Sequence, residues 1–352
     1  MKIKMVMLAV MLSILLIVPA TSYKADMVDN SHIKWKSNEI ETAIITDGNT
    51  LYVGGSGPNN YTKIQDAIND SNDGDTIFVY DDSSPYYENV VINKSVKLVG
   101  EYRENTVIMA NGKDAVNITA NKVSVSGFMV TSRASTRPFA GVKICKAGNA
   151  TISNCDICSF GIAVYMNISY GNKIERCNMR ESGTGIETDS SNKNVFVDCN
   201  IYNNSDGIWL CSSHENIISK CNIYDNDVGI DIMGVKNVLS SCNITNNKIG
   251  IYISGFSNKI TRCNICENSV WGIMLLVGSA NKVINNNFCG NKINAFFTNA
   301  AFNVWLRNYW KGWIFPFPKP IFGFLVWSFR EAAIPWLNFD WMPRMMPYRG
   351  GR

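Results

Sequence analysis

Apolar residues recur at every second position in short runs along most of this chain, and the runs themselves return about every 22 residues. Alternation with a period of two is typical of β-strands, because successive side chains of a strand point to opposite faces. The runs are separated by Asn, Ser, Asp and Gly, which favour turns. The pattern therefore predicts an all-β chain of short strands joined by tight turns.

The repeat is most regular in a column of six cysteines, whose successive gaps are 22, 22, 22, 21 and 21 residues. An asparagine precedes each cysteine by five residues from the second repeat on, and a Gly-Ile pair or its near equivalent follows. The cysteines are Cys155, Cys177, Cys199, Cys221, Cys242 and Cys263. The asparagines are Asn172, Asn194, Asn216, Asn237 and Asn258, and the Gly-Ile pairs begin at Gly161, Gly185, Gly207, Gly229, Gly250 and Gly272.

A repeat of this length, built from three short strands, predicts a parallel β-helix in residues 76–302, with about 9–11 coils. Coils stack about 4.8 Å apart, so equivalent residues form columns. We expect the isoleucines inside and the asparagines bonded to the backbone of their own and neighbouring coils. We expect the cysteine column to be buried as free thiols, because in-register stacking suits disulfide geometry poorly.

The two ends of the chain depart from the repeat. Residues 1–25 predict a signal peptide, with Lys2 and Lys4 before an apolar stretch, and an uncleaved anchor is the alternative. A linker (26–50) and an N-terminal cap (51–75) follow, and the cap includes a short helix with Thr62 as its expected N-cap. Residues 303–352 are rich in aromatic residues and proline, which predicts a cap on the last coils or a tail that binds a membrane surface or a partner.

Charge argues against nucleic acid as a partner, and hydropathy argues against a C-terminal transmembrane span. The net charge is +4 and no run of Lys and Arg stands out, so nucleic acid is not expected. Pro316, Pro318 and Lys319 interrupt the C-terminal apolar run, so we expect no transmembrane span in the mature chain.

The Asn-Lys-Ile-x-x-Cys-Asn and Gly-Ile-x-Ile elements resemble the right-handed parallel β-helix of the pectate-lyase-like superfamily. Within it, the sequence is similar to the NosD-type periplasmic copper-binding β-helix family. The Ile-Gln-Asp-Ala-Ile segment of the cap and the Asn-Tyr-Trp after the last coil share this resemblance. It implies an extracytoplasmic protein that assists a copper enzyme, or a surface protein that acts on carbohydrate.

Copper is implied by the resemblance alone. The chain has two histidines, His32 and His214, far apart in sequence. The spacings Cys155-x-x-Cys158 and Cys263-x-x-Cys266 resemble metal sites, but each begins in the buried column. Thioethers bind Cu(I), but Met342, Met345 and Met346 lie among prolines and aromatic residues, where packing is the simpler interpretation. We therefore predict no metal ligand.

One outward face combines acidic and aromatic side chains, which suits a sugar chain lying along the helix. Stacking places Glu187 and Asp231 about 10 Å apart with Trp209 between them. The predicted saccharide face consists of Tyr165, Glu187, Asp189, Trp209, Asp231 and Tyr252. The alternative is an ordinary solvated strand face, and no catalytic residue is assigned.

The sequence thus favours an exported, noncatalytic surface or scaffold β-helix that binds carbohydrate. An accessory protein for maturation of an extracytoplasmic copper enzyme is the first alternative, and a polysaccharide lyase or hydrolase is the second. The expected partners are a polysaccharide, or an assembly at the cell surface or with a copper enzyme. Secretion, the cell surface and the periplasm all agree with the predicted signal peptide.

Overall fold

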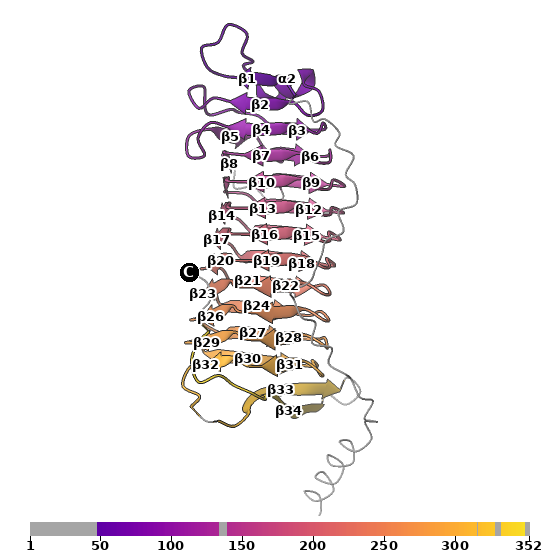
Figure 1. Cartoon of the computed structure of the whole chain (residues 1–352), viewed down its shortest axis with the longest axis vertical. Helices are drawn as coiled ribbons and strands as arrows, with labels where there is room; N and C mark the ends of the chain where they lie inside the picture. Colours follow the sequence, from indigo (N-terminus) through magenta and orange to yellow (C-terminus); the bar gives the residue numbers. More distant parts are fainter. Residues whose placement is uncertain (1–47, 134–138, 315, 328–331, 349–352) are drawn as a thin grey trace, which may run out of the picture. The chain divides into compact units, whose positions relative to one another are not determined.

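The computed structural model describes residues 48–133, 139–314, 316–327 and 332–348. The predicted signal peptide and residues 26–47 of the predicted linker lie outside these residues. In the described part, short strands stack into three ladders, and each of the regular central coils contributes one strand to each ladder (Figure 1).

The first ladder contains β1 (Thr50–Val53), β2 (Thr76–Val79), β4 (Lys97–Gly100), β7 (Ser124–Ser126), β10 (Thr151–Ser153), β13 (Lys173–Glu175), β16 (Val195–Val197), β19 (Ile217–Ser219), β22 (Val238–Ser240), β25 (Lys259–Thr261), β28 (Lys282–Ile284), β31 (Val304–Leu306) and β34 (Ala332–Asp340). The second contains β5 (Val107–Ala110), β8 (Met129–Ser132), β11 (Asp156–Cys158), β14 (Asn178–Arg180), β17 (Asn200–Tyr202), β20 (Asn222–Tyr224), β23 (Asn243–Thr245), β26 (Asn264–Cys266), β29 (Asn287–Cys289) and β32 (Tyr309–Trp310). The third contains β3 (Val90–Ile92), β6 (Val116–Ile118), β9 (Ala140–Cys145), β12 (Ile162–Asn167), β15 (Thr184–Asp189), β18 (Asp206–Cys211), β21 (Val228–Met233), β24 (Ile249–Ile253), β27 (Trp271–Leu275), β30 (Ile293–Thr298) and β33 (Lys319–Trp327).

These ladders confirm the predicted right-handed parallel β-helix, which makes about 12 turns in all. The prediction of about 9–11 coils applied to residues 76–302. The further turns come from β1, which pairs with β2, and from the strands that follow residue 302. Sequence periodicity missed β1 because the segment between β1 and β2 contains a helix, so that the paired residues Thr50 and Thr76 are farther apart than the repeat.

The core consists of inward columns of isoleucine, such as Ile186, Ile208 and Ile230, which are fully buried. The register corrects the alignment of the first Gly-Ile pair by two residues, because Val164 pairs with Ile186. Ala163 therefore occupies the glycine position and is buried. Each fully buried isoleucine contributes about 1.5–3 kcal/mol, so the stacked columns supply most of the stabilisation.

Each turn uses the same local device, in which a residue with left-handed backbone geometry precedes an inward polar side chain or thiol. Before the cysteine column this residue has a φ between 50° and 57°, although it is never glycine there. The inward asparagines then bond to one another from coil to coil. The Asn194 backbone N–H and Nδ2 both donate to Oδ1 of Asn216, at 2.9 and 3.1 Å. The left-handed residues are Asn154, Arg176, Asp198, Lys220, Ser241 and Arg262.

All six thiols of the cysteine column are buried and free, as the sequence predicts. A hydrogen bond to Cys221 and burial raise the pKa of the Cys199 thiol, which keeps it protonated. The argument against in-register disulfides was nevertheless wrong in general. Cys266 and Cys289 are register partners with Cα atoms 4.6 Å apart, and they form a disulfide on an outward face.

The N-terminal turns carry α2 (Ile64–Asp70). Thr62 is not its N-cap, because that position is held by Lys63, whose side chain makes no capping bond. Instead, the carboxylate of Glu88 accepts hydrogen bonds from the backbone N–H groups of Ile64 and Gln65, at 2.8 and 3.0 Å. A carboxylate near a helix N-terminus is also favoured by the helix dipole.

The C-terminal end carries an antiparallel hairpin of β33 and β34, whose strands also pair with β30 and β31. Asp340 in β34 is fully buried at the end of one polar column. Its Oδ2 accepts from the backbone N–H and Nδ2 of Asn308, each at 2.9 Å, and from Nε1 of Trp310 at 3.0 Å. In the preceding coils an asparagine of the next coil supplies this acceptor. At the end of the column Asp340 of the hairpin supplies it.

Candidate functional site

The structure brings five of the six predicted saccharide-face residues into one outward column of the third ladder. Adjacent members are register partners, so they stack in consecutive coils. Asp189 lies in the neighbouring outward column, beside Asn167, whose Nδ2 donates to Asp189 Oδ2 at 3.2 Å. The single column is Tyr165, Glu187, Trp209, Asp231 and Tyr252.

At the centre of the column, two polar atoms are buried without a hydrogen-bond partner among the described residues. They are the indole Nε1 of Trp209 and Oδ1 of Asp231. One is a donor and the other an acceptor, and they belong to register partners in adjacent coils. Leaving such atoms unpaired costs about 1–3 kcal/mol each, so a hydroxyl-bearing ligand that satisfied both would gain that difference.

A pocket of about 370 Å³ opens beside Trp209 and Glu187. Asp206 also lines it, and sequence reasoning missed this residue because only positions after the Gly-Ile pairs were considered. Asp206 precedes Gly207 and points outward in the same strand as Trp209. A second, more polar hollow of about 660 Å³ adjoins it through the shared residue Ser205 and is lined by asparagines with Asp225, Asp227 and Lys248.

Burial and neighbouring carboxylates weaken the acidity of this site. Burial raises the pKa of Asp231 to about 7, and the charge of Asp206 adds to the effect. Burial also raises the pKa of Glu187, and Asp189 and Asp206 contribute in the same direction. The column therefore holds one carboxyl group that is half protonated near neutral pH, and such perturbed groups are typical of functional sites.

The raised pKa of Asp231 predicts a pH-dependent stability. An unfolded aspartate titrates near 3.9, so between about pH 4 and 7 the folded chain keeps a proton that the unfolded chain loses. The contribution of protonated Asp231 to the stability of the folded chain is complete below the pKa of an unfolded aspartate. This contribution is lost as pH rises to the folded pKa of about 7. Compared with Asp231→Asn, the native protein should lose about 4 kcal/mol of unfolding free energy across this range, measured by urea denaturation. Parallel pH profiles for the two proteins would contradict the assignment.

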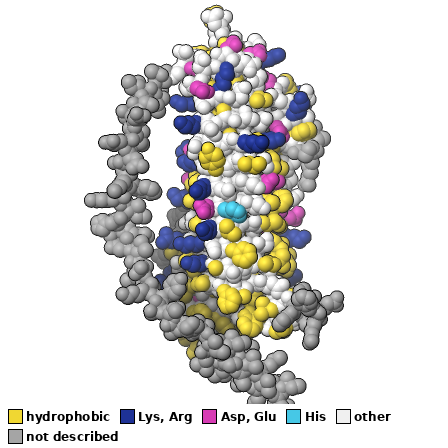
Figure 2. Space-filling model, turned by 90° about the vertical axis from the view of Figure 1, so that its right-hand side faces the viewer, with side chains coloured by type: hydrophobic (Ala, Val, Ile, Leu, Met, Phe, Trp, Pro, Cys, Tyr) yellow, Lys and Arg dark blue, Asp and Glu magenta, His cyan; other side chains and the backbone are white. Residues whose placement is uncertain are grey.

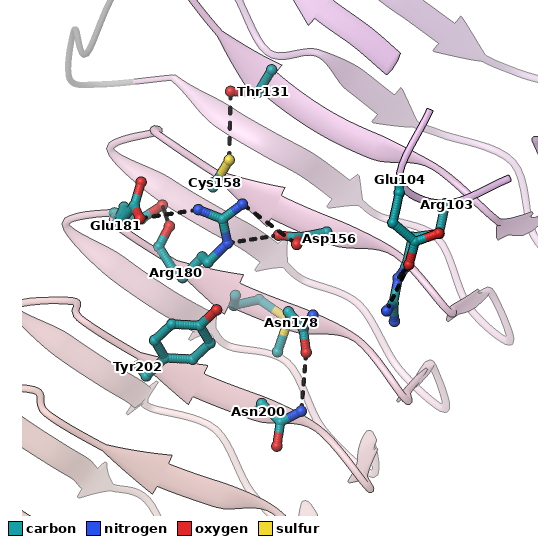
Figure 3. Close-up of polar contacts among 12 residues, drawn as sticks. Arg103, Glu104, Thr131, Asp156, Cys158, Asn178, Arg180, Glu181, Asn200 and Tyr202 are labelled. Carbon is teal, nitrogen blue, oxygen red and sulfur yellow. Dashed lines mark hydrogen bonds and ion pairs between the residues drawn. The ribbon is translucent and has the colours of Figure 1, made fainter. Parts of the chain in front are cut away.

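A second polar cluster lies on the second ladder, but its polar atoms are paired with one another (Figure 3). Arg180 Nε donates to Asp156 Oδ1 at 3.0 Å, and its Nη1 donates to Glu181 Oε1 at 3.0 Å. The Cys158 thiol lies 3.5 Å from Thr131 Oγ1. Because these groups satisfy one another, the cluster fixes neighbouring coils, and the third ladder remains the better candidate for a ligand.

The described residues do not fit a copper ion. They contain no group of three His, Cys, Asp or Glu side chains arranged to hold a metal. His214 is half-buried, and its Nδ1 accepts a hydrogen bond from the Val235 N–H at 3.1 Å. Met342 and Met345 share a hollow with Arg307 and Arg344, whose positive charges oppose a bound cation. His32 lies outside the described residues.

The family described as "Periplasmic copper-binding protein (NosD)" matches residues 120–312, more than half of the chain. The chain belongs to this NosD family. The match covers the most regular coils, and with them the whole column from Tyr165 to Tyr252. A search of curated proteins finds no match.

Solved structures with the same fold include the ORF18 protein of Geobacillus virus E2, at 14% identity and a TM-score of 0.57, covering 79% of this chain and 59% of that one. The DFA-IIIase from Arthrobacter chlorophenolicus A6, solved in complex with GF2, is 11% identical, with a TM-score of 0.54 and coverages of 73% and 94%. The Dettilon tailspike protein (gp208) is 15% identical, with a TM-score of 0.50 and coverages of 73% and 66%. This chain thus spans 59% of the viral ORF18 protein and 66% of the tailspike. These likenesses show the fold alone.

Within the described ranges, no helix of this NosD-family chain is long and apolar enough to cross a lipid bilayer.

Proposed function

We propose that this chain is an exported, noncatalytic NosD-family β-helix that binds an extended neutral saccharide along the column from Tyr165 to Tyr252. The observation that carries the proposal is the unpaired donor of Trp209 beside the unpaired acceptor of Asp231. A sugar hydroxyl both accepts and donates, so the hydroxyl groups of a saccharide match the chemistry of both atoms. Aromatic rings above and below offer apolar contact to sugar rings.

The charge of the groove selects the class of saccharide. Glu187, Asp206 and Asp231 surround Trp209, so a polymer of uronic acids or sulfated sugars would meet like charges. Like charges at short range disfavour binding, whereas neutral hydroxyl groups donate readily to carboxylates. The five stacked residues extend over about 19 Å, which suits an oligosaccharide of several rings rather than a monosaccharide.

The test is a panel of neutral and acidic oligosaccharides, with dissociation constants measured by calorimetry. Trp209→Ala should weaken binding of a neutral ligand at least tenfold, because the ring contact and the N–H donor are both lost. Tyr202→Ala is the matched control, because this half-buried aromatic residue lies on the second ladder, away from the proposed site. Its ring stacks on that of Tyr224, with ring centroids 4.9 Å apart. Equal losses in both variants, or binding of acidic polymers alone, would refute the proposal.

The raised pKa of Asp231 favours one second candidate, cleavage of a glycosidic bond. A carboxyl group that keeps its proton near pH 7 is suited to act as a general acid. Glu187 lies two coils away, about 10 Å, which is close to the separation in inverting glycosidases. Release of reducing ends by the native protein, abolished in Asp231→Asn, would replace the noncatalytic proposal with this one.

A further inference from the structure

The C-terminal hairpin exposes apolar side chains on both of its faces. Phe322 and Leu337 are paired across the strands and are 64% and 43% exposed. On the opposite face, Trp336 and Ile334 are 39% and 46% exposed. The face with Phe322 is open along its length. On the other face Ile321 is buried, and only the part beyond Gly323 and Phe324, through which β33 pairs with β30, is open. Figure 1 shows the hairpin lying across the end of the stacked coils.

The outward face also has a nearly wholly apolar hollow of about 290 Å³. It is bounded by Phe322 and Phe324 on one strand and by Pro335 and Leu337 on the other. The segment after the hairpin continues the surface, because Trp341 and Met346 are 66% and 75% exposed. Exposed apolar surface of this extent is unusual for a monomer and marks an interaction site.

Basic residues outnumber acidic ones around the hairpin, where the sequence places Glu331 between the two strands. Among the described residues from 268 to 348, the only acidic side chain is Asp340, which is fully buried. Figure 2 shows hydrophobic side chains gathering toward this end of the solenoid, while acidic ones lie mainly nearer the other end. The basic residues in the same stretch are Lys282, Lys292, Arg307, Lys311, Lys319 and Arg344.

We propose that the hairpin is a membrane-surface anchor that inserts into the interfacial layer of a bilayer with anionic headgroups. A docked protein would cover one face of the hairpin, whereas a lipid interface surrounds both. Exposed aromatic side chains with nearby basic residues are the composition of interfacial segments, and each basic residue near an anionic surface adds to the attraction. The hairpin keeps its own backbone hydrogen bonds, so shallow insertion leaves few polar groups unpaired.

The test uses the full chain and vesicles of phosphatidylcholine and phosphatidylglycerol with brominated acyl chains, which quench tryptophan fluorescence at short range. Quenching should be strong with anionic vesicles and weaker with phosphatidylcholine alone or at high salt. Trp327→Phe, Trp336→Phe and Trp341→Phe together should remove most of the quenchable signal, which places the contact at the hairpin and the segment after it. Phe322→Ser with Phe324→Ser should weaken partitioning at least tenfold.

A matched control replaces two equally exposed aromatic residues far from the hairpin, Tyr102→Ser and Phe256→Ser, which are 58% and 46% exposed. This variant should bind vesicles like the native protein. Equal quenching in the native protein and in the variant that lacks Trp327, Trp336 and Trp341 would overturn the proposal. So would a native dimer that becomes monomeric on Phe322→Ser with Phe324→Ser, since the face would then serve self-association.

Discussion

Asn216→Ala should lower the free energy of unfolding by about 3–5 kcal/mol, because the substitution breaks the buried asparagine column at its centre. Oδ1 of Asn216 accepts from the backbone N–H and Nδ2 of Asn194, and its own Nδ2 donates to Ser191 O at 3.1 Å and to Asn237 Oδ1 at 3.2 Å. Alanine leaves these partners without hydrogen bonds in a part of the interior that is closed to solvent, where Asn216 is fully buried. Urea denaturation measures the loss.

Asn222→Ala provides the control within the next strand of the same coil. Asn222 Nδ2 donates to Asn200 Oδ1 at 2.9 Å, and Asn222 accepts from Asn243 at 2.9 Å, so it belongs to a similar column. Asn222 is exposed, however, and water replaces its partners when the side chain is removed. Its loss should cost under about 1 kcal/mol. Similar losses of unfolding free energy in both variants would show that burial does not determine how much each asparagine column stabilises the chain.

The parallel β-helix was predictable because its information is local and repeated. Each coil repeats the same pattern, which is a residue with left-handed backbone geometry, then an inward Asn or Cys, and isoleucines two residues apart. Repetition at about 22 residues made the burial of Cys177, and the hydrogen bond of Asn216 to the backbone of a neighbouring coil, predictable from the sequence. Where the repeat breaks, prediction weakened. The first Gly-Ile pair was misaligned by two residues, so that Tyr165 pairs with Glu187 and not with Asp189, although Tyr165 still faces outward.

Features that depend on a single long-range contact could not be predicted. Glu88 caps α2 from 24 residues away, and nothing in the helix sequence indicates it. The Cys266–Cys289 disulfide joins outward residues of adjacent coils. Both cysteines lie outside the repeated column in the sequence, but no local signal there indicates that they pair. At the candidate site, the acidic and aromatic column followed from alternation, but the part of Asp206 and the unpaired atoms of Trp209 and Asp231 required side-chain packing.

Asp340→Ala should destabilise the chain by about 3–5 kcal/mol and promote aggregation. The substitution leaves three buried donors without an acceptor, which are the Asn308 N–H, Asn308 Nδ2 and Trp310 Nε1. An unpaired buried donor costs about 1–3 kcal/mol. The same change loosens β34 from β31, with which it pairs through Trp305 and Asp340, and so exposes the edge of the last coil. Exposed parallel edges recruit other strands, so light scattering should rise as thermal unfolding shifts to lower temperature.

Asp340→Asn separates the role of the acceptor from that of the charge. Asparagine keeps one carbonyl oxygen, so it can still accept from Asn308 and Trp310, and it would extend the polar column with the residue type that fills it elsewhere. We expect this variant to recover most of the stability lost in Asp340→Ala and to remain monomeric. If Asp340→Ala has the same free energy of unfolding as the native chain, the hydrogen bonds of Asp340 do not stabilise the end of the ladder. If Asp340→Asn is as unstable as Asp340→Ala, the negative charge itself, opposite three N–H donors, provides the stabilisation.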